Sequence, residues 1–167
     1  MAAVDLGWHT TSVPFMRTLG VCWEGQDASG IRMRLPRAPV VLQADGRAVD
    51  LRAVVALLDH AGGAAVYAAL PSTATATLEL RVDVLATPPA RDDVVVQAAL
   101  TAQAHGSALV RGTAAADAAG APACMAMTAR YIVGSGPGQA PADAVYLAQR
   151  AQAVARFAAV AAADAAC

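Results

Sequence analysis

LRAVVALLDHAGGAAVYAAL, residues 51–70, is the stretch that decides the fold. Asp50 before it is a plausible N-cap and Pro71 follows it, so the sequence predicts one helix over this range. The side chains are apolar or very small nearly all round, which predicts that the helix is buried on most sides. Gly62 and Gly63 would each weaken an exposed helix by about 1 kcal/mol, but inside a core they let another backbone approach closely.

Asp59 is the one acidic residue within this range. Burying a lone carboxylate is costly unless it is paired or protonated, and such carboxylates cluster at functional sites. The sequence therefore predicts a functional role for Asp59. The alternative is a structural polar contact across a subunit interface, for example to a backbone N–H or to Arg52. His60 points about 100° away on the helix, so the pair is not predicted to act as a dyad.

Strand-like segments lie on both sides of this helix. Turn signals separate them at hairpin spacing, and a proline-containing loop over 36–49 leads into the helix. The predicted strands are 21–26, 31–36, 73–86, 93–106, 107–120 and 122–134. A single apolar helix needs a sheet that wraps it. The order predicts an α+β fold in which a curved antiparallel sheet encloses one long central helix.

An all-helical bundle is the main alternative, because abundant alanine could hide strand signals. The alternation in LELRVDVL, residues 78–85, argues against it and predicts one face made of Leu78, Leu80, Val82 and Val84. In the last strand, Met125, Met127 and Ala129 are predicted to alternate against Ala126, Thr128 and Arg130. A short capped helix or turn over 9–20, ended by Gly20, is predicted before the first strand.

The predicted organisation is one sheet-and-helix domain over residues 1–134, followed by a linker and a C-terminal helical extension over 135–167. The net charge of -1 and the sequence pI of about 6.2 give no electrostatic reason to expect binding to nucleic acid or to an anionic membrane surface. We see no signal peptide and no apolar run long enough to span a membrane, so a cytoplasmic protein is expected. The three cysteines have no CxxC spacing, and neither a metal site nor a cofactor is predicted.

Four segments carry a resemblance to a known family. They are PFMRTLG (14–20), RMRLP (32–36), LLDHAGGAA (57–65) and LELRVDVLATPPARDD (78–93). Together they resemble the hotdog-fold acyl-CoA thioesterases of the phenylacetate-pathway type, over about residues 12–133. The family pattern L-x-D-x-A-x-x-x-A in the central helix falls on Asp59, Ala61 and Ala65.

The resemblance implies that Asp59 is the general base or nucleophile that acts on an acyl-CoA thioester. A backbone N–H at the helix N-terminus stabilises the developing oxyanion in such enzymes, and here the candidates are Leu51 and Arg52. Thr77 falls where the family often has a Ser or Thr that orients the attacking water, although a strand threonine is equally common as a purely structural residue. Sites of this type usually lie at a dimer interface, so a homodimer or a dimer of dimers is expected.

Further residues are expected to contact the acyl-CoA. The arginines Arg91, Arg111 and Arg130 could meet the CoA phosphates, since guanidinium binds phosphate bidentately. For any one of them, a solvated arginine at a strand edge is the more common role. The other candidate substrate-binding positions lie on or beside the helix: Asp50, Val55, Leu58 and Gly62.

One departure from the family pattern concerns the loop before the helix. The family usually has His-Gly-Gly nine residues before the aspartate, after an asparagine-containing loop; here the run is Asp50-Leu51-Arg52 and the asparagine position is Ala44. Leu51 keeps a backbone N–H, but Asp50 would compete for the donors. Two functions therefore stay open, an acyl-CoA thioesterase and a non-catalytic hotdog protein that binds acyl-CoA or a small apolar ligand. A hydratase is disfavoured because no Asp-x-x-x-x-His motif is present.

Overall fold

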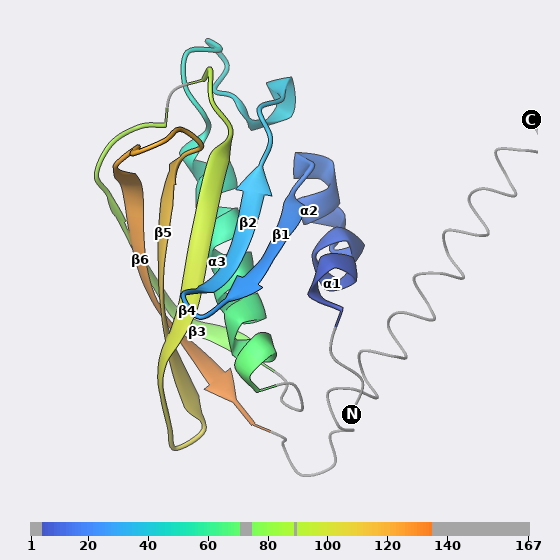
Figure 1. Ribbon diagram of the computed structural model, residues 1–167, viewed down its shortest axis with the longest axis vertical. Helices are drawn as coiled ribbons and strands as arrows, with labels where there is room; N and C mark the ends of the chain where they lie inside the picture. The colour runs from blue at the N-terminus through green and yellow to red at the C-terminus, as the bar shows by residue number, and fades with distance from the viewer. Residues whose placement is uncertain (1–4, 71–74, 89, 135–167) are drawn as a thin grey trace, which may run out of the picture.

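The computed structural model describes residues 5–70, 75–88 and 90–134, and places six strands and three α-helices in them (Figure 1). The helices are α1 (Leu6–Ser12), α2 (Pro14–Leu19) and α3 (Leu51–Ala69), with a single 3-10 turn, η1 (Pro39–Val41). The strands are β1 (Cys22–Asp27), β2 (Gly30–Leu35), β3 (Thr75–Val84), β4 (Val94–Ala104), β5 (Ser107–Ala116) and β6 (Ala123–Val133).

All six strands form one antiparallel sheet in the order β1-β2-β4-β5-β6-β3. The sheet curves around α3, which contacts β2, β3, β4, β5 and β6, while α1 and α2 lie beside β1 (Figure 1). The architecture predicted from the sequence is confirmed. The predicted linker and helix over 135–167 lie outside the described residues and stay predictions.

The core forms between α3 and the inner face of the sheet. Leu57 and Leu58 on the helix are fully buried, as are Met33 and Met125 on the strands. Truncating a leucine in such a place to alanine typically costs about 2–5 kcal/mol. The predicted alternation in β6 is confirmed, because Met125, Met127 and Ala129 are buried and Thr128 and Arg130 are exposed.

The helix is less enclosed than its composition predicted. One stripe remains half-exposed in the single chain and runs along α3 through Val55, Asp59, Gly63 and Tyr67, at intervals of four residues. The stripe lies on the flank of the helix next to β3 and β6, and its apolar residues Val55 and Tyr67 pack against the core while staying partly exposed.

Two details of the N-terminal half and the edge strand differ from the prediction. The short helix or turn expected over 9–20 is two helices, because Pro14 starts α2 at its first turn; Gly20 ends α2 with φ 72°, as predicted. A β-bulge between Thr77 and Glu79 breaks the alternation of β3, and Leu78 is exposed instead of sharing the face of Leu80 and Val82.

No helix among residues 5–70, 75–88 and 90–134 has the length and apolar character needed to cross a membrane.

Gly62 is the point of closest approach between α3 and the sheet. A Cβ at this position would lie 2.2 Å from the hydroxyl oxygen of Tyr131 on β6, whereas a Cβ at Gly63 would come no nearer than 3.9 Å to the same ring. The sequence predicted that these glycines allow another backbone to approach closely. At Gly62 it is the side chain of Tyr131, and not a backbone, that occupies the space.

These contacts predict opposite effects for two adjacent substitutions. Gly63→Ala should stabilise the protein by up to about 1 kcal/mol, because alanine has the higher helix propensity. Gly62→Ala should destabilise it by about 1–3 kcal/mol, because the overpacking displaces Tyr131. Urea unfolding of both variants measures the difference, and equal effects would contradict the packing described.

Candidate active site

Asp59 lies in the half-exposed stripe of α3, and two hydroxyl groups from neighbouring strands bind it. The Thr77 hydroxyl on β3 donates to Oδ1 of Asp59 at 2.8 Å. The Tyr131 hydroxyl on β6 donates to the main-chain oxygen of Asp59 at 2.9 Å and lies 3.2 Å from Oδ1. In the described part of the chain, every hydrogen bond to this carboxylate is made at Oδ1, so Oδ2 is left available.

The bulge in β3 is what turns Thr77 toward the helix. Thr77 is in register with Tyr131, and Glu79 with Arg130, so Leu78 is the extra residue between them. In a regular strand Thr77 and Glu79 would share a face, and Thr77 would point away from α3. A bulge commonly re-aims a side chain in this way.

Tyr131 lies beneath Asp59 and is 2% exposed as a residue. Burial and the negative charge of Asp59 raise the pKa of Tyr131 well above its usual value. The phenol therefore keeps its proton at neutral pH and serves as the donor.

The N-terminus of α3 is capped by Asp50, as the sequence predicted. Its Oδ1 accepts from the Arg52 backbone N–H at 2.9 Å, and the Arg52 guanidinium also binds the carboxylate, with Nη2 2.5 Å from Oδ2. These hydrogen bonds from Arg52 lower the pKa of Asp50 to about 2. The Arg52 N–H is thus engaged, while the Leu51 N–H has no partner among the described residues.

The loop that leads to this N-terminus is held on two sides. The Asp50 N–H donates to the Val41 oxygen at 2.8 Å, and the Val49 N–H donates to the Pro88 oxygen at 3.1 Å. The turn between β3 and β4 is therefore attached to the segment that precedes α3.

This attachment places Arg91, which follows Pro88 in the turn, at the same end of the helix as Leu51. Arg91 is highly exposed and pairs with Asp92, with Nε 3.3 Å from Oδ2. It is thus separated from Asp59 by most of the first half of α3.

The remaining predicted substrate-binding residues are distributed over different surfaces. Val55 is half-buried one turn before Asp59 in the same stripe, whereas Leu58 and Gly62 are buried within the chain. Arg130 points to the outer face of the sheet, where it pairs with Glu79 at 3.6 Å. The structure does not bring Arg130 and Asp59 together in one chain, because they lie on opposite faces of the sheet.

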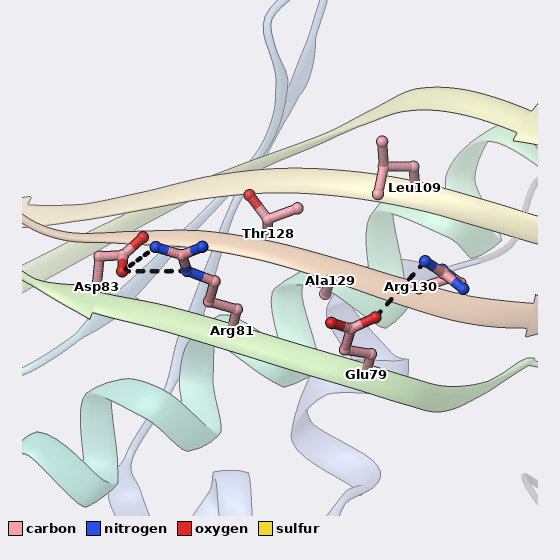
Figure 2. Close-up of a pocket in the computed structure, with 7 residues that line it drawn as sticks. All are labelled: Glu79, Arg81, Asp83, Leu109, Thr128, Ala129 and Arg130. Atoms are coloured by element: carbon pink, nitrogen blue, oxygen red, sulfur yellow. Dashed lines mark hydrogen bonds and ion pairs between the residues drawn. The ribbon is translucent and has the colours of Figure 1, made fainter.

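Figure 2 shows the hollow in which Arg130 lies, on the outer face of β3, β5 and β6. Two ion pairs lie in it: Arg130 on β6 pairs with Glu79 on β3, and Arg81 pairs with Asp83 along β3. Arg111 belongs to the same outer face, next to Thr128 in the register of β5 and β6, and has no ion pair among the described residues. The inner face that holds Asp59 is separate from this hollow.

Comparisons with known proteins give matches among solved structures alone. No protein-family model and no curated protein sequence matches the chain. A thioesterase family protein from Silicibacter pomeroyi is 25% identical, with a TM-score of 0.64 over 77% of this chain and 94% of that chain. A thioesterase from Haemophilus influenzae is 15% identical, with a TM-score of 0.71 over 81% and 92%.

This chain has the hotdog fold. A Bacillus halodurans protein, solved with CoA, shares it at 23% identity and a TM-score of 0.55, over 61% of this chain and 66% of that chain. The resemblance seen in the sequence is therefore confirmed at the level of the fold. Within this hotdog chain, the site is made of α3 residues and of the two strands that lie next to each other at one side of the sheet, β6 and β3.

Sequence reasoning missed Tyr131. A signal for it was present, since Tyr131 continues the buried alternation of Met125, Met127 and Ala129, and a buried tyrosine usually finds a hydrogen-bond partner. A glycine such as Gly62, which allows close approach, is a second signal. The sequence does not reveal how β6 is positioned against α3, and this position brings Tyr131 next to Gly62.

The cap of α3 predicts a pH-dependent contribution to stability. Asp50→Ala should cost about 1 kcal/mol at pH 7, and Asp50→Asn less, because asparagine also caps helices well. The folded-state pKa of about 2 lies below the unfolded value of about 3.9, so the charged Asp50 stabilises the protein above pH 4 and loses this effect as the pH falls toward 2.

The check is urea unfolding of the wild type and of both variants at several pH values between 2.5 and 7. The difference in unfolding free energy between wild type and Asp50→Asn should shrink on acidification. A difference that is constant with pH would contradict the assigned ion pair.

Proposed function

We propose that this hotdog protein hydrolyses an acyl-CoA thioester, with Asp59 as the general base or nucleophile. The observation that carries the proposal is the carboxylate itself. Two hydroxyls hold one of its oxygens, and the other is available at a half-exposed position of the central helix. The thioesterases among the solved structures that share the fold support the same reaction class.

The proposed reaction starts with water near Oδ2 of Asp59. The carboxylate takes a proton from this water as the oxygen attacks the thioester carbonyl carbon. The resulting oxyanion accepts a hydrogen bond from a backbone N–H at a helix N-terminus, and the C–S bond then breaks. The thiolate of CoA takes up the proton, and the carboxylic acid leaves. In the nucleophilic variant, Oδ2 attacks the carbonyl carbon first and the C–S bond breaks, so that CoA leaves as a thiolate that solvent protonates. Water then hydrolyses the mixed anhydride to the carboxylic acid and regenerates Asp59.

The Leu51 N–H is the proposed oxyanion donor, because the Asp50 carboxylate engages the N–H of Arg52. Leu51 and Asp59 are eight residues apart, which corresponds to about 12 Å along the helix axis. A base must reach the reacting atoms within about 3 Å, directly or through one water. One chain therefore cannot supply both groups to a single thioester.

We accordingly propose that two copies of the chain form each site, in a homodimer or a dimer of dimers. β3 is an edge strand and exposes the apolar side chains of Leu78 and Val84, with Leu85 directly after it. Such an edge favours pairing with another strand. The half-exposed stripe of α3 would be covered in the same assembly, which would bring Leu51 of the second copy toward Asp59.

The position of Arg91 supports a role in binding the CoA phosphates. It lies at the Leu51 end of α3, and a guanidinium is suited to phosphate oxygens. The CoA in the Bacillus halodurans structure supports a ligand of this type.

A non-catalytic hotdog protein that binds acyl-CoA or a small apolar ligand is the second candidate. The cap by Asp50 favours it, because the carboxylate covers the Arg52 N–H and places negative charge beside the Leu51 N–H. Removing one oxyanion donor typically costs about 2.7–4 kcal/mol in the activation free energy.

Thiol release from short, medium, long and aryl acyl-CoA esters tests the reaction. The wild type should hydrolyse at least one class, and Asp59→Asn should reduce kcat by about 10²-fold or more, as expected for loss of a general base. Asp83→Asn is the matched control on the outer face of β3 and should keep wild-type kcat.

Full activity in Asp59→Asn would exclude the proposed base. A folded wild type that binds the esters but hydrolyses none of them would favour the binding protein.

Mixed dimers test the division of the site between two copies. Leu51→Pro removes the proposed donor N–H at the first helical position, where proline is tolerated, and Leu51→Ala controls for the lost side chain. Both Leu51→Pro and Asp59→Asn should be inactive alone. When they are co-expressed, random pairing should restore about one quarter of wild-type activity, since half the dimers then contain one intact site of two.

If both groups of a site came from the same chain, no mixed dimer would contain an intact site. Activity that stays at the level of the separate variants would therefore contradict the two-chain site.

A further inference from the structure

The contact between Tyr131 and Asp59 involves two atoms of the same residue. The phenol oxygen lies 2.9 Å from the main-chain oxygen of Asp59 and 3.2 Å from its Oδ1. The hydroxyl therefore joins the carboxylate to the backbone of its own helix. Since Thr77, the cross-strand partner of Tyr131, also binds Oδ1 at 2.8 Å, one carboxylate oxygen is fixed by donors from two strands.

The space for the phenol is provided by Gly62. Any side chain there would meet the Tyr131 oxygen at 2.2 Å and the adjacent ring carbon at 2.9 Å. Gly62 lies three residues after Asp59, so the notch and the carboxylate face the same part of β6. Tyr131 thus fills the space left by Gly62 and reaches Asp59, which lies one turn earlier on the same helix.

We infer that Tyr131 is a positioning residue for Asp59, which fixes Oδ1 against the helix so that Oδ2 points to the reacting water or thioester. This inference rests on the proposed function. Holding a catalytic group in one geometry accelerates a reaction, because the carboxylate does not have to be ordered in each turnover. The restraint acts on the carboxylate and contributes nothing to binding of the acyl group or of CoA.

The high pKa of Tyr131, caused by burial and by the charge of Asp59, agrees with this role. The phenol therefore keeps its proton at neutral pH and is available as a donor to Asp59.

The first test is Tyr131→Phe, which removes one oxygen and keeps the ring. We expect kcat to fall about 10-fold or more, as for loss of a hydrogen bond to a charged group, with KM within about 2-fold of wild type. Thr77→Val should have a similar effect, and Thr77→Ser should restore the activity. Thr113→Val on the outer face of β5 removes an exposed hydroxyl and should leave both constants unchanged.

Two further variants separate positioning from folding. Gly62→Ala leaves Tyr131 in the chain but displaces its hydroxyl, so it should reproduce the kcat loss of Tyr131→Phe. In the double variant Gly62→Ala/Tyr131→Phe the two losses should not add, because both remove the same hydrogen bond. Circular dichroism confirms that each variant is folded under the assay conditions.

A proton NMR measurement tests the contact without any substrate. A slowly exchanging hydroxyl resonance should be present in the wild type, absent in Tyr131→Phe, shifted in Asp59→Asn and unchanged in Asp83→Asn.

If the wild type hydrolyses an ester and Tyr131→Phe keeps its kcat, the positioning role is overturned and the proposed function stands. If no ester is hydrolysed although the resonance responds to Asp59→Asn, the proposed function is overturned, and with it the role of Tyr131 in positioning Asp59 for catalysis.

Discussion

The contact between α3 and the inner face of the sheet is the constraint on which the rest of this structure depends. The helix presents one continuous stripe of buried residues, and strands β2 and β4–β6 bury alternate side chains against it. Beside this buried stripe, a half-exposed one runs along the helix through Asp59. At this position the carboxylate is hydrogen-bonded by side chains of β3 and β6 and is still partly exposed.

The same packing creates the site from parts that are distant in the sequence. The register of β6 against β3 places Tyr131 opposite Thr77, and the bulge in β3 turns Thr77 inward. Gly62 then lets the phenol approach the helix closely enough to reach Asp59. The carboxylate is restrained by elements that begin 16 and 64 residues after it, counted from Asp59 to Thr75 and to Ala123.

The N-terminus of α3 and the position of Asp59 differ in their hydrogen bonding. At the N-terminus, Asp50 and Arg52 form a closed cap that satisfies one of the free N–H groups and leaves that of Leu51. At Asp59, two neutral hydroxyls bind an anion. This separation of about 12 Å along the helix is the basis of the proposal that a second copy of the chain completes the site.

The sequence by itself determined the helix over 51–70, its cap at Asp50, the positions of the strands and the identity of Asp59 as the residue of interest. These follow from local rules, namely capping preference, turn chemistry and the period of apolar residues. Tertiary structure alone decided that Thr77 faces the helix and that Tyr131 reaches Asp59. Both depend on a bulge and on the register between strands, which are set by the fit of the whole sheet to the helix and have no marker in the local pattern of residues.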